Sequence, residues 1–107
     1  MRVATFIATL AMGLCPMEMA GAPKAQTHTV TIEGVRFQPD HLTVARGDTV
    51  VWVNKDLVPH TATSESGGFD SGTIPAEGSW EYTVRQKGEF AYTCTFHPTM
   101  KAALNVK

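Results

Sequence analysis

The feature that most restricts the fold is a series of short segments with strand periodicity, separated by turn residues at intervals of roughly 8–12 residues. Thr49–Asn54 is rich in β-branched and aromatic residues, which favour strands. In Ser79–Val84 the apolar residues alternate with polar ones, so Trp80, Tyr82 and Val84 should share one face. No segment of useful length has helical periodicity. The pattern predicts an all-β protein with a single domain, either a sandwich or a barrel.

Further segments extend this pattern along the chain. The other expected strands are Thr29–Glu33, Leu42–Ala45, His60–Thr63, Phe90–Cys94 and Lys101–Val106. Phe37–Asp40 should interrupt the pairing, because proline cannot donate to a strand ladder. Glu65–Gly78 contains four glycines and one proline, and it is expected to form a loop with at most short strand pieces.

The first 25 residues have the order of a secretory signal peptide. Arg2 gives a positive start, Val3–Leu14 is an apolar run, and small residues follow up to Ala25. The apolar run is shorter than the roughly 20 residues that a membrane span needs. We therefore expect a signal peptide over residues 1–25, a mature domain over residues 26–107 without a membrane span, and export to the periplasm. Retention of the signal as an anchor and lipid attachment at Cys15 are the alternatives.

Cys94 is the only cysteine after this leader, so the mature domain cannot form the internal disulfide that often staples a small exported protein. A lone cysteine in an oxidising compartment is a liability, an intermolecular partner or a functional thiolate. A bound metal would both stabilise a small domain and protect the sulfur. From residue 26 onward seven Lys or Arg stand against nine Asp or Glu, a net charge of −2, and no basic cluster suggests nucleic-acid binding.

Four side chains have the chemistry of a metal site. Cys94, His97 and Met100 follow one another with two residues between each pair, and His60 lies upstream. They offer one thiolate, two imidazoles and one thioether, which is the His₂Cys set with a weak axial Met that holds type 1 copper. A lone cysteine is most often a small buried hydrophobic residue. Here, however, four candidate ligands occur together at ligand spacing in a chain with a predicted export signal, and this combination favours a metal. Zinc also accepts Cys and His, yet a thioether is a poor zinc ligand, so Met100 favours one copper ion.

Two segments of the chain resemble the cupredoxin family, and most closely its amicyanin-like and pseudoazurin-like bacterial members. Val51–His60 is similar to the first ligand strand and loop of the family, and Cys94–Met100 is similar to the short second ligand loop with the amicyanin spacing. The resemblance extends over Thr27–Lys107 and implies a cupredoxin-like Greek-key β-sandwich. It also implies the metal ligands: His60, Cys94 and His97 as the strong ones and Met100 as the weak axial one.

The resemblance implies two supporting features as well. Asn54 matches a residue that ties the loop of the first ligand to the residue after the cysteine, which is Thr95 here. An apolar patch should surround His97, the ligand nearest the solvent. The candidates for this patch are Leu57, Pro59, Phe96, Pro98 and Met100.

The chain also departs from the family pattern. Thr61 follows the first histidine where many members have Asn, and Phe96 stands where amicyanin has Pro. These departures leave every ligand in place and should instead affect the reduction potential and the partner surface. His28 and His41 are expected to be ordinary solvated side chains rather than ligands.

The expected function is that of a periplasmic type 1 copper protein, not an enzyme, that carries single electrons between redox partners. These partners, such as a donor dehydrogenase or a cytochrome-like acceptor, should bind transiently to a monomer. The alternative is a copper chaperone or scavenger without an electron-transfer role. Against it, four of the five methionines lie in the leader rather than in an open Met-rich site. A metal-free adhesion-type sandwich is the third possibility.

Overall fold

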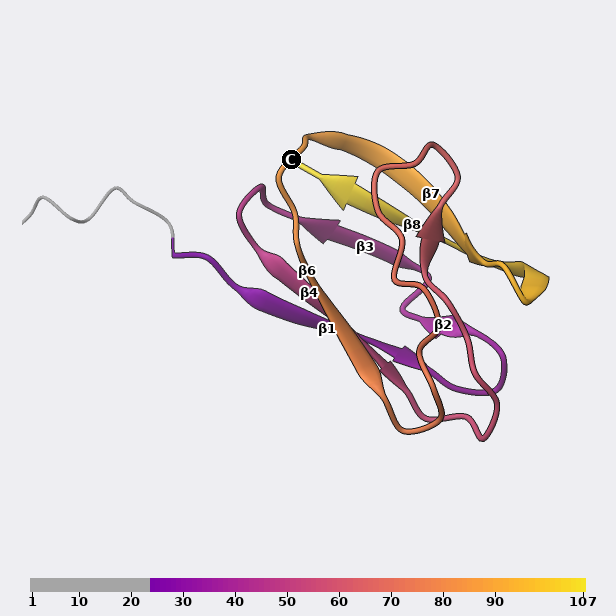
Figure 1. Ribbon diagram of the computed structural model, residues 1–107. Helices are drawn as coiled ribbons and strands as arrows, with labels where there is room; N and C mark the ends of the chain where they lie inside the picture. Colours follow the sequence, from indigo (N-terminus) through magenta and orange to yellow (C-terminus); the bar gives the residue numbers. More distant parts are fainter. Residues whose placement is uncertain (1–23) are drawn as a thin grey trace, which may run out of the picture.

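The computed structural model describes residues 24–107 and folds them into two four-stranded β-sheets packed face to face (Figure 1). The predicted signal peptide, residues 1–25, lies outside the described residues except for its last two. Within the described part of the chain, no helix has the length and apolar character needed to cross a membrane.

Eight strands form the two sheets. In chain order they are β1 (Thr27–Ile32), β2 (Phe37–Gln38), β3 (His41–Val44), β4 (Thr49–Asn54), β5 (Thr63–Ser64), β6 (Ser79–Thr83), β7 (Gly88–Cys94) and β8 (His97–Val106). The first sheet has the order β2-β1-β4-β6 and the second the order β3-β8-β7-β5. The pairs β1–β4 and β3–β8 are parallel and the others antiparallel. The predicted all-β sandwich is therefore confirmed.

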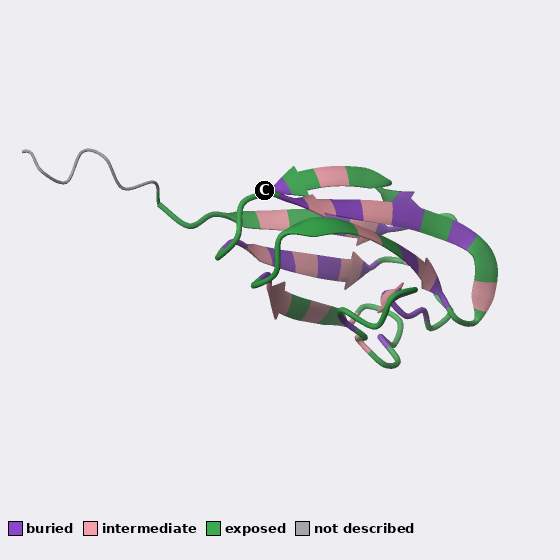
Figure 2. Cartoon of the chain, turned by 90° about the horizontal axis from the view of Figure 1, so that it is seen from above, coloured by how far each residue is buried: buried purple, intermediate pink, exposed green. Residues whose placement is uncertain are grey.

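The core lies between the sheets and follows the side-chain alternation of the strands. Along β4, Val50, Trp52 and Asn54 are buried while the residues between them are half-buried, and buried residues also alternate with more exposed ones along β1 and β8 (Figure 2). Trp52 packs edge-on against Tyr92, with ring centroids 5.6 Å apart, and its Nε1–H donates to the Tyr92 hydroxyl at 3.2 Å. Trp80 packs against Trp52 in a tilted arrangement with ring centroids 5.4 Å apart, on the inward face that the alternation predicted. These aromatic contacts fix β4 against β7, the two strands that lead to the predicted ligands.

Three differences from the predicted strands exceed two residues or add a strand. Phe37–Gln38 does not interrupt the pairing but forms β2, which pairs antiparallel with the end of β1. β5 begins at Thr63 rather than at His60, because His60 bonds to the loop residue Ile74 in an isolated bridge. β8 begins at His97, four residues before the predicted start, because the chain turns back within two residues after Cys94.

The end of the sandwich at which β1 starts is closed by a polar clasp around Asp48. This buried carboxylate accepts hydrogen bonds from the His28 side chain and from the backbone N–H groups of Gln26 and Ala45, at 2.9–3.0 Å. The His28 bond and the two amide bonds lower the pKa of Asp48 to about 2. The clasp joins β1 to the turn before β4, and His28 takes part in it through its bond to Asp48. His41 bonds instead to its exposed neighbour Asp40.

Candidate metal centre

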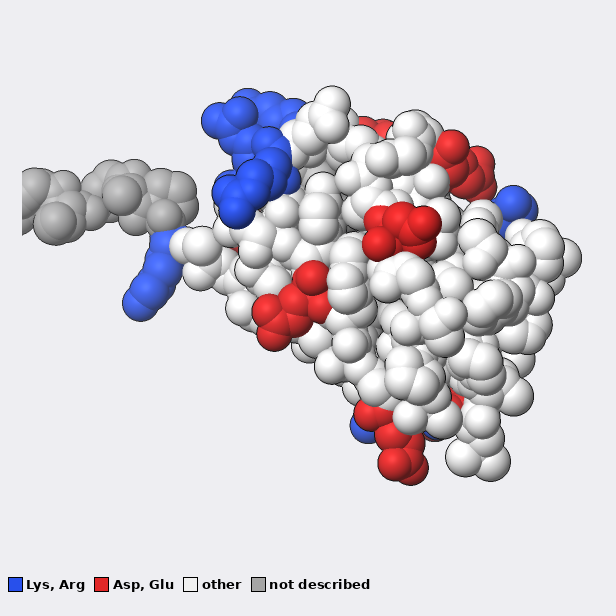
Figure 3. Space-filling view, in the orientation of Figure 1, with Lys and Arg blue, Asp and Glu red and all other residues white. Residues whose placement is uncertain are grey.

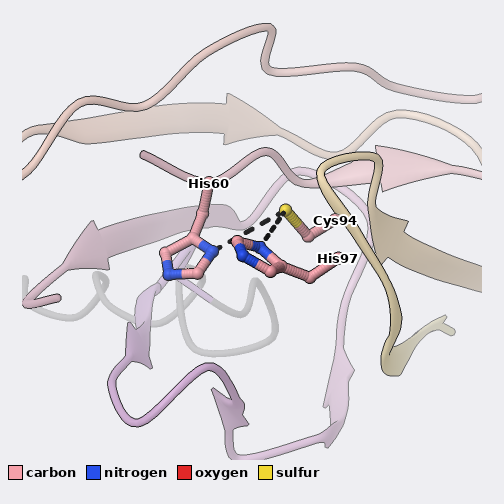
Figure 4. Close-up of side chains that lie close together, drawn as sticks. All are labelled: His60, Cys94 and His97. Atoms are coloured by element: carbon pink, nitrogen blue, oxygen red, sulfur yellow. Dashed lines mark hydrogen bonds between the residues drawn. The ribbon is translucent and has the colours of Figure 1, made fainter. Parts of the chain in front are cut away.

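Three predicted ligands converge at the other end of the sandwich (Figure 4). The Cys94 Sγ atom lies 3.7 Å from His60 Nδ1 and 3.6 Å from His97 Nδ1, and the three possible donor atoms all lie within 4.8 Å of one another. His60 comes from the loop after β4, Cys94 is the last residue of β7 and His97 the first of β8. Distant parts of the sequence therefore meet in one cluster, which the folded sandwich holds together.

His60 is fixed by its backbone and by both sides of its ring. Its N–H donates to the Ile74 carbonyl at 3.1 Å and its carbonyl accepts from Ile74 N–H at 2.7 Å. The fully buried ring has Nε2 2.8 Å from Asp56 Oδ2. An ionised carboxylate only accepts, so Nε2 carries a proton and Nδ1 is the ring nitrogen that faces the sulfur.

Asp56 is itself held by the β1–β2 turn. Its carboxylate accepts from Gly34 N–H at 2.8 Å and from Val35 N–H at 2.9 Å. Burial acts to raise the pKa of Asp56, but these two amide bonds and the bond with His60 outweigh it and lower that pKa. Val35 has a φ of 56°, a conformation that costs a β-branched residue on the order of 1–3 kcal/mol. The two amides that this turn aims at Asp56 offset that strain.

The β7–β8 hairpin brings the C-terminal ligands together. Cys94 pairs with His97 across the turn, whereas Thr93, the next residue back, pairs with Lys101. Between these two pairs β7 advances by one residue and β8 by four, so Pro98–Met100 bulges out of the ladder. The bulge allows Met100 to be buried, with 4% of its surface exposed, three residues after the half-buried His97. The turn returns His97 to the Cys94 sulfur, as the spacing predicted for this pair.

The expected role of Asn54 is wrong. Its side chain does not contact Thr95 but donates to the carbonyl oxygens of Val58, Ile74 and Pro75 at 2.9–3.2 Å, and its Oδ1 accepts from Asp56 N–H. Asn54 lies fully buried beneath the His60 loop, where those carbonyls are its nearest partners. It therefore shapes the loop internally and does not link it to the hairpin.

Thr61 makes the link that was expected of Asn54. Its hydroxyl oxygen accepts from Thr95 N–H at 2.9 Å and lies 3.2 Å from the Thr95 hydroxyl. Its own N–H donates to Cys94 Sγ at 3.2 Å. The sequence contained a signal for this role, because Thr61 directly follows a ligand and departs from the family pattern.

The two sulfur–nitrogen separations fit one shared metal ion. A first-row ion such as zinc binds nitrogen ligands at about 2.0–2.1 Å and sulfur ligands at about 2.3 Å. When the nitrogen–metal–sulfur angle lies between the tetrahedral and the trigonal value, the nitrogen and sulfur atoms are therefore about 3.6–3.8 Å apart. The two observed sulfur–nitrogen distances, 3.6 and 3.7 Å, lie in this range. A thiolate beside two imidazoles suits copper, and a thioether suits it further.

One ligand reaches the surface. His60 and Cys94 are fully buried, whereas His97 is half-buried. The segments next to the ligands expose apolar side chains, with 89% of Leu57 and 50% of Phe96 accessible. Met100, which the sequence placed in this patch, is buried instead, because the bulge turns it inward. In the view of Figure 3 the end with the β7–β8 hairpin is mostly free of charged atoms, while Lys and Arg gather near the C-terminus.

The sequence matches the family described as a cupredoxin-like domain over residues 3–106, almost the whole chain. The amicyanin of Paracoccus versutus is 28% identical over 97 residues, which cover 86% of this chain and 73% of the relative. Amicyanin-alpha of Methylorubrum extorquens is 26% identical over 110 residues, which cover 98% of this chain and 92% of the relative. The resemblance to amicyanin-like members is confirmed.

Solved structures of amicyanin variants share the fold. The Cu(I) form of a methionine-to-alanine variant has a TM-score of 0.72 and 26% identity, over 86% of this chain and 91% of that one. The reduced state of a proline-to-phenylalanine variant has a TM-score of 0.70 and 27% identity, over 87% of this chain and 92% of that one.

Proposed function

The chain belongs to the cupredoxin-like domain family, and from this premise we propose that it is a type 1 copper protein that carries single electrons between redox partners in the periplasm. The observation that carries the proposal is the cluster of one sulfur and two imidazole nitrogens, in which the sulfur lies 3.7 Å and 3.6 Å from the nitrogens, separations that one shared metal ion can span. We assign His60, Cys94 and His97 as the strong ligands of one copper ion and Met100 as the weak axial ligand. When bound, copper supplies the exchange of one electron between Cu(II) and Cu(I).

Residues outside the ligand set hold the ligand side chains in place. Asp56 fixes the His60 ring, and Thr61 N–H holds the Cys94 sulfur from the side. Both ligands are excluded from water. A site that is held in this way can accept and release an electron with little rearrangement, which favours electron transfer over catalysis by a single site.

The partner surface is proposed to lie around His97. This is the strong ligand that reaches the surface, and the exposed Leu57 and Phe96 lie on the two ligand-bearing loops. A surface with exposed apolar side chains and few charges fits transient contact with a dehydrogenase as donor or a cytochrome-like acceptor. The protein is proposed to act as an exported monomer, with residues 1–25 as its signal peptide.

Addition of Cu(II) to the purified protein tests the proposal. We expect an intense blue absorption that arises from the Cys94 thiolate, stoichiometric with one copper ion and reversibly bleached by a reductant. A faint spectrum of tetragonal copper would contradict an electron-transfer site and support the copper-delivery alternative. No copper binding at all would contradict both.

Met100→Gln should retain copper and the blue colour but lower the reduction potential. The amide oxygen of glutamine is a harder ligand than a thioether and favours Cu(II). We expect the ratio of oxidised to reduced protein at a fixed potential to rise about tenfold, which corresponds to about 59 mV for one electron. Voltammetry measures the shift. Thr99→Gln, at the exposed neighbouring position, is the matched control and should leave the potential unchanged. An unchanged spectrum and potential in Met100→Gln would exclude Met100 as the axial ligand.

A further inference from the structure

A chain of hydroxyl groups connects the metal centre to an exposed carboxylate. The Thr95 hydroxyl lies 3.2 Å from the Thr61 hydroxyl, which lies 2.9 Å from the Thr63 hydroxyl, which donates to Asp70 Oδ1 at 3.1 Å. Thr95 directly follows the ligand Cys94, whereas Asp70 lies in the loop between β5 and β6. The chain thus spans from the ligand hairpin to the surface.

The carboxylate determines the direction of this chain. The Asp70 carboxylate can only accept, so Thr63 donates its single hydroxyl proton to Asp70. Thr61 must then donate to Thr63, and Thr95 must donate to Thr61. The Thr61 oxygen consequently accepts twice, from the Thr95 hydroxyl and from Thr95 N–H at 2.9 Å. Every proton in the chain points toward Asp70.

The loop that carries Asp70 is well fixed. Ser71 N–H donates to the Ala62 carbonyl at 3.0 Å, and Ala62 N–H donates to the Ser71 hydroxyl at 2.8 Å. Phe69, on the other side of Asp70, is 6% exposed and its carbonyl accepts from Ser64 N–H at 2.9 Å. Gly72 N–H donates to the same carboxylate oxygen that Thr63 uses. The Asp70 carboxylate is therefore held at the end of the chain although the residue is exposed.

We propose that Asp70 is a remote positioning residue of the metal centre, which strengthens the attachment of the Cys94–His97 hairpin to the His60 loop through Thr63 and Thr61. A hydrogen bond to a carboxylate is stronger than a neutral one, and it polarises the bonds behind it. Polarisation makes the Thr61 oxygen a better acceptor for Thr95 N–H. Because Thr61 N–H also contacts Cys94 Sγ, the same polarisation acts next to the sulfur ligand.

The first test uses the copper-free protein and does not depend on the proposed function. Asp70→Ala and Thr63→Val each remove one link and should accelerate hydrogen exchange of the Thr95 amide about tenfold, as measured by NMR. Asp70→Asn retains an acceptor oxygen and should change this rate less than Asp70→Ala. Glu65→Gln, which removes a charge in the same loop but outside the chain, should leave the rate unchanged. Unchanged Thr95 exchange in both Asp70→Ala and Thr63→Val would overturn the proposal.

The second test uses the copper-loaded protein and rests on the proposed function. Asp70→Ala and Thr63→Val should each change the ratio of oxidised to reduced protein about threefold at a fixed potential. The double variant should show the effect of one change rather than the sum, because both break the same chain. A shift that is equal in Asp70→Ala and Asp70→Asn, absent in Thr63→Val and removed by salt would be a plain charge effect and would overturn the proposal. If the protein fails to form blue copper while the exchange effects hold, the proposed function fails and the positioning role of Asp70 stands.

Discussion

Replacing Cys94 with serine should remove the intense visible absorption of the copper-loaded protein completely. The colour of a type 1 site comes from a copper–thiolate bond, and a serine hydroxyl is a harder ligand that does not form a thiolate. The fold should survive, because serine is close to isosteric and can still accept from Thr61 N–H, which lies 3.2 Å from the sulfur. Visible spectroscopy measures the loss, and circular dichroism of the copper-free variant verifies the fold.

Cys15→Ser in the full chain with residues 1–25 retained is the matched control, because it makes the same change at the other cysteine of the sequence. We expect it to keep the full absorption, since Cys15 lies in the predicted signal peptide. If Cys94→Ser kept the band, or Cys15→Ser lost it, the assignment of the sulfur ligand would be wrong. Copper that binds weakly to the two histidines of Cys94→Ser would be colourless by comparison and would agree with the assignment.

The ligand cluster could be predicted from the sequence because the residue types and their spacing indicate the donor atoms of the site. A thiolate, two imidazoles and a thioether at short intervals have few uses other than a soft metal site. The structure brings His60, Cys94 and His97 together as predicted. The alternation of side chains in β4 and β6 could also be predicted from the sequence. Trp52, Trp80 and Tyr82 face the core, as the two-residue periodicity of a strand predicts.

The polar contacts around the ligands were harder to predict, although the departure from the family pattern at Thr61 marked that position. Which loop residue reaches Thr95 depends on where each side chain ends in space, and Asn54 and Thr61 are both polar and both near His60 in sequence. Only the fold shows that Asn54 is buried beneath the loop while Thr61 faces the hairpin. The start of β8 was missed for a related reason. Its first four residues carry the ligand motif, and they do not alternate as a regular strand would.

The metal centre depends on two separate attachments of the His60 loop. Asp56, whose carboxylate is held by the amides of the β1–β2 turn, contacts the outer side of the His60 ring, and Thr61 holds the hairpin from the inner side. Asn54 lies between them, because its side chain binds the loop carbonyls and also Asp56 N–H. Removal of the Asn54 side chain should therefore affect both the stability of the domain and the position of the ligand His60.

Asn54→Ala should destabilise the copper-free protein by about 3 kcal/mol or more. The substitution removes the donor to three carbonyl oxygens and the acceptor for Asp56 N–H, at a residue with no exposed surface. Each buried group that is left without a partner costs about 1–3 kcal/mol. For a domain of this size the melting temperature should fall by about 12 °C or more. Urea denaturation of the copper-free protein measures the free energy of unfolding.

Asn105→Ala is the matched control, since Asn105 is half-buried on β8. Its free energy of unfolding should stay within about 0.5 kcal/mol of the original protein, as is usual for positions near the surface. Asn54→Ala should also weaken copper binding, because Asp56 loses a bond that positions it beneath His60. Equal denaturation midpoints for the two alanine variants would show that the buried network around Asn54 contributes nothing particular. In that case the His60 loop would have to be held by the Ile74 bridge and the Thr61 contacts alone.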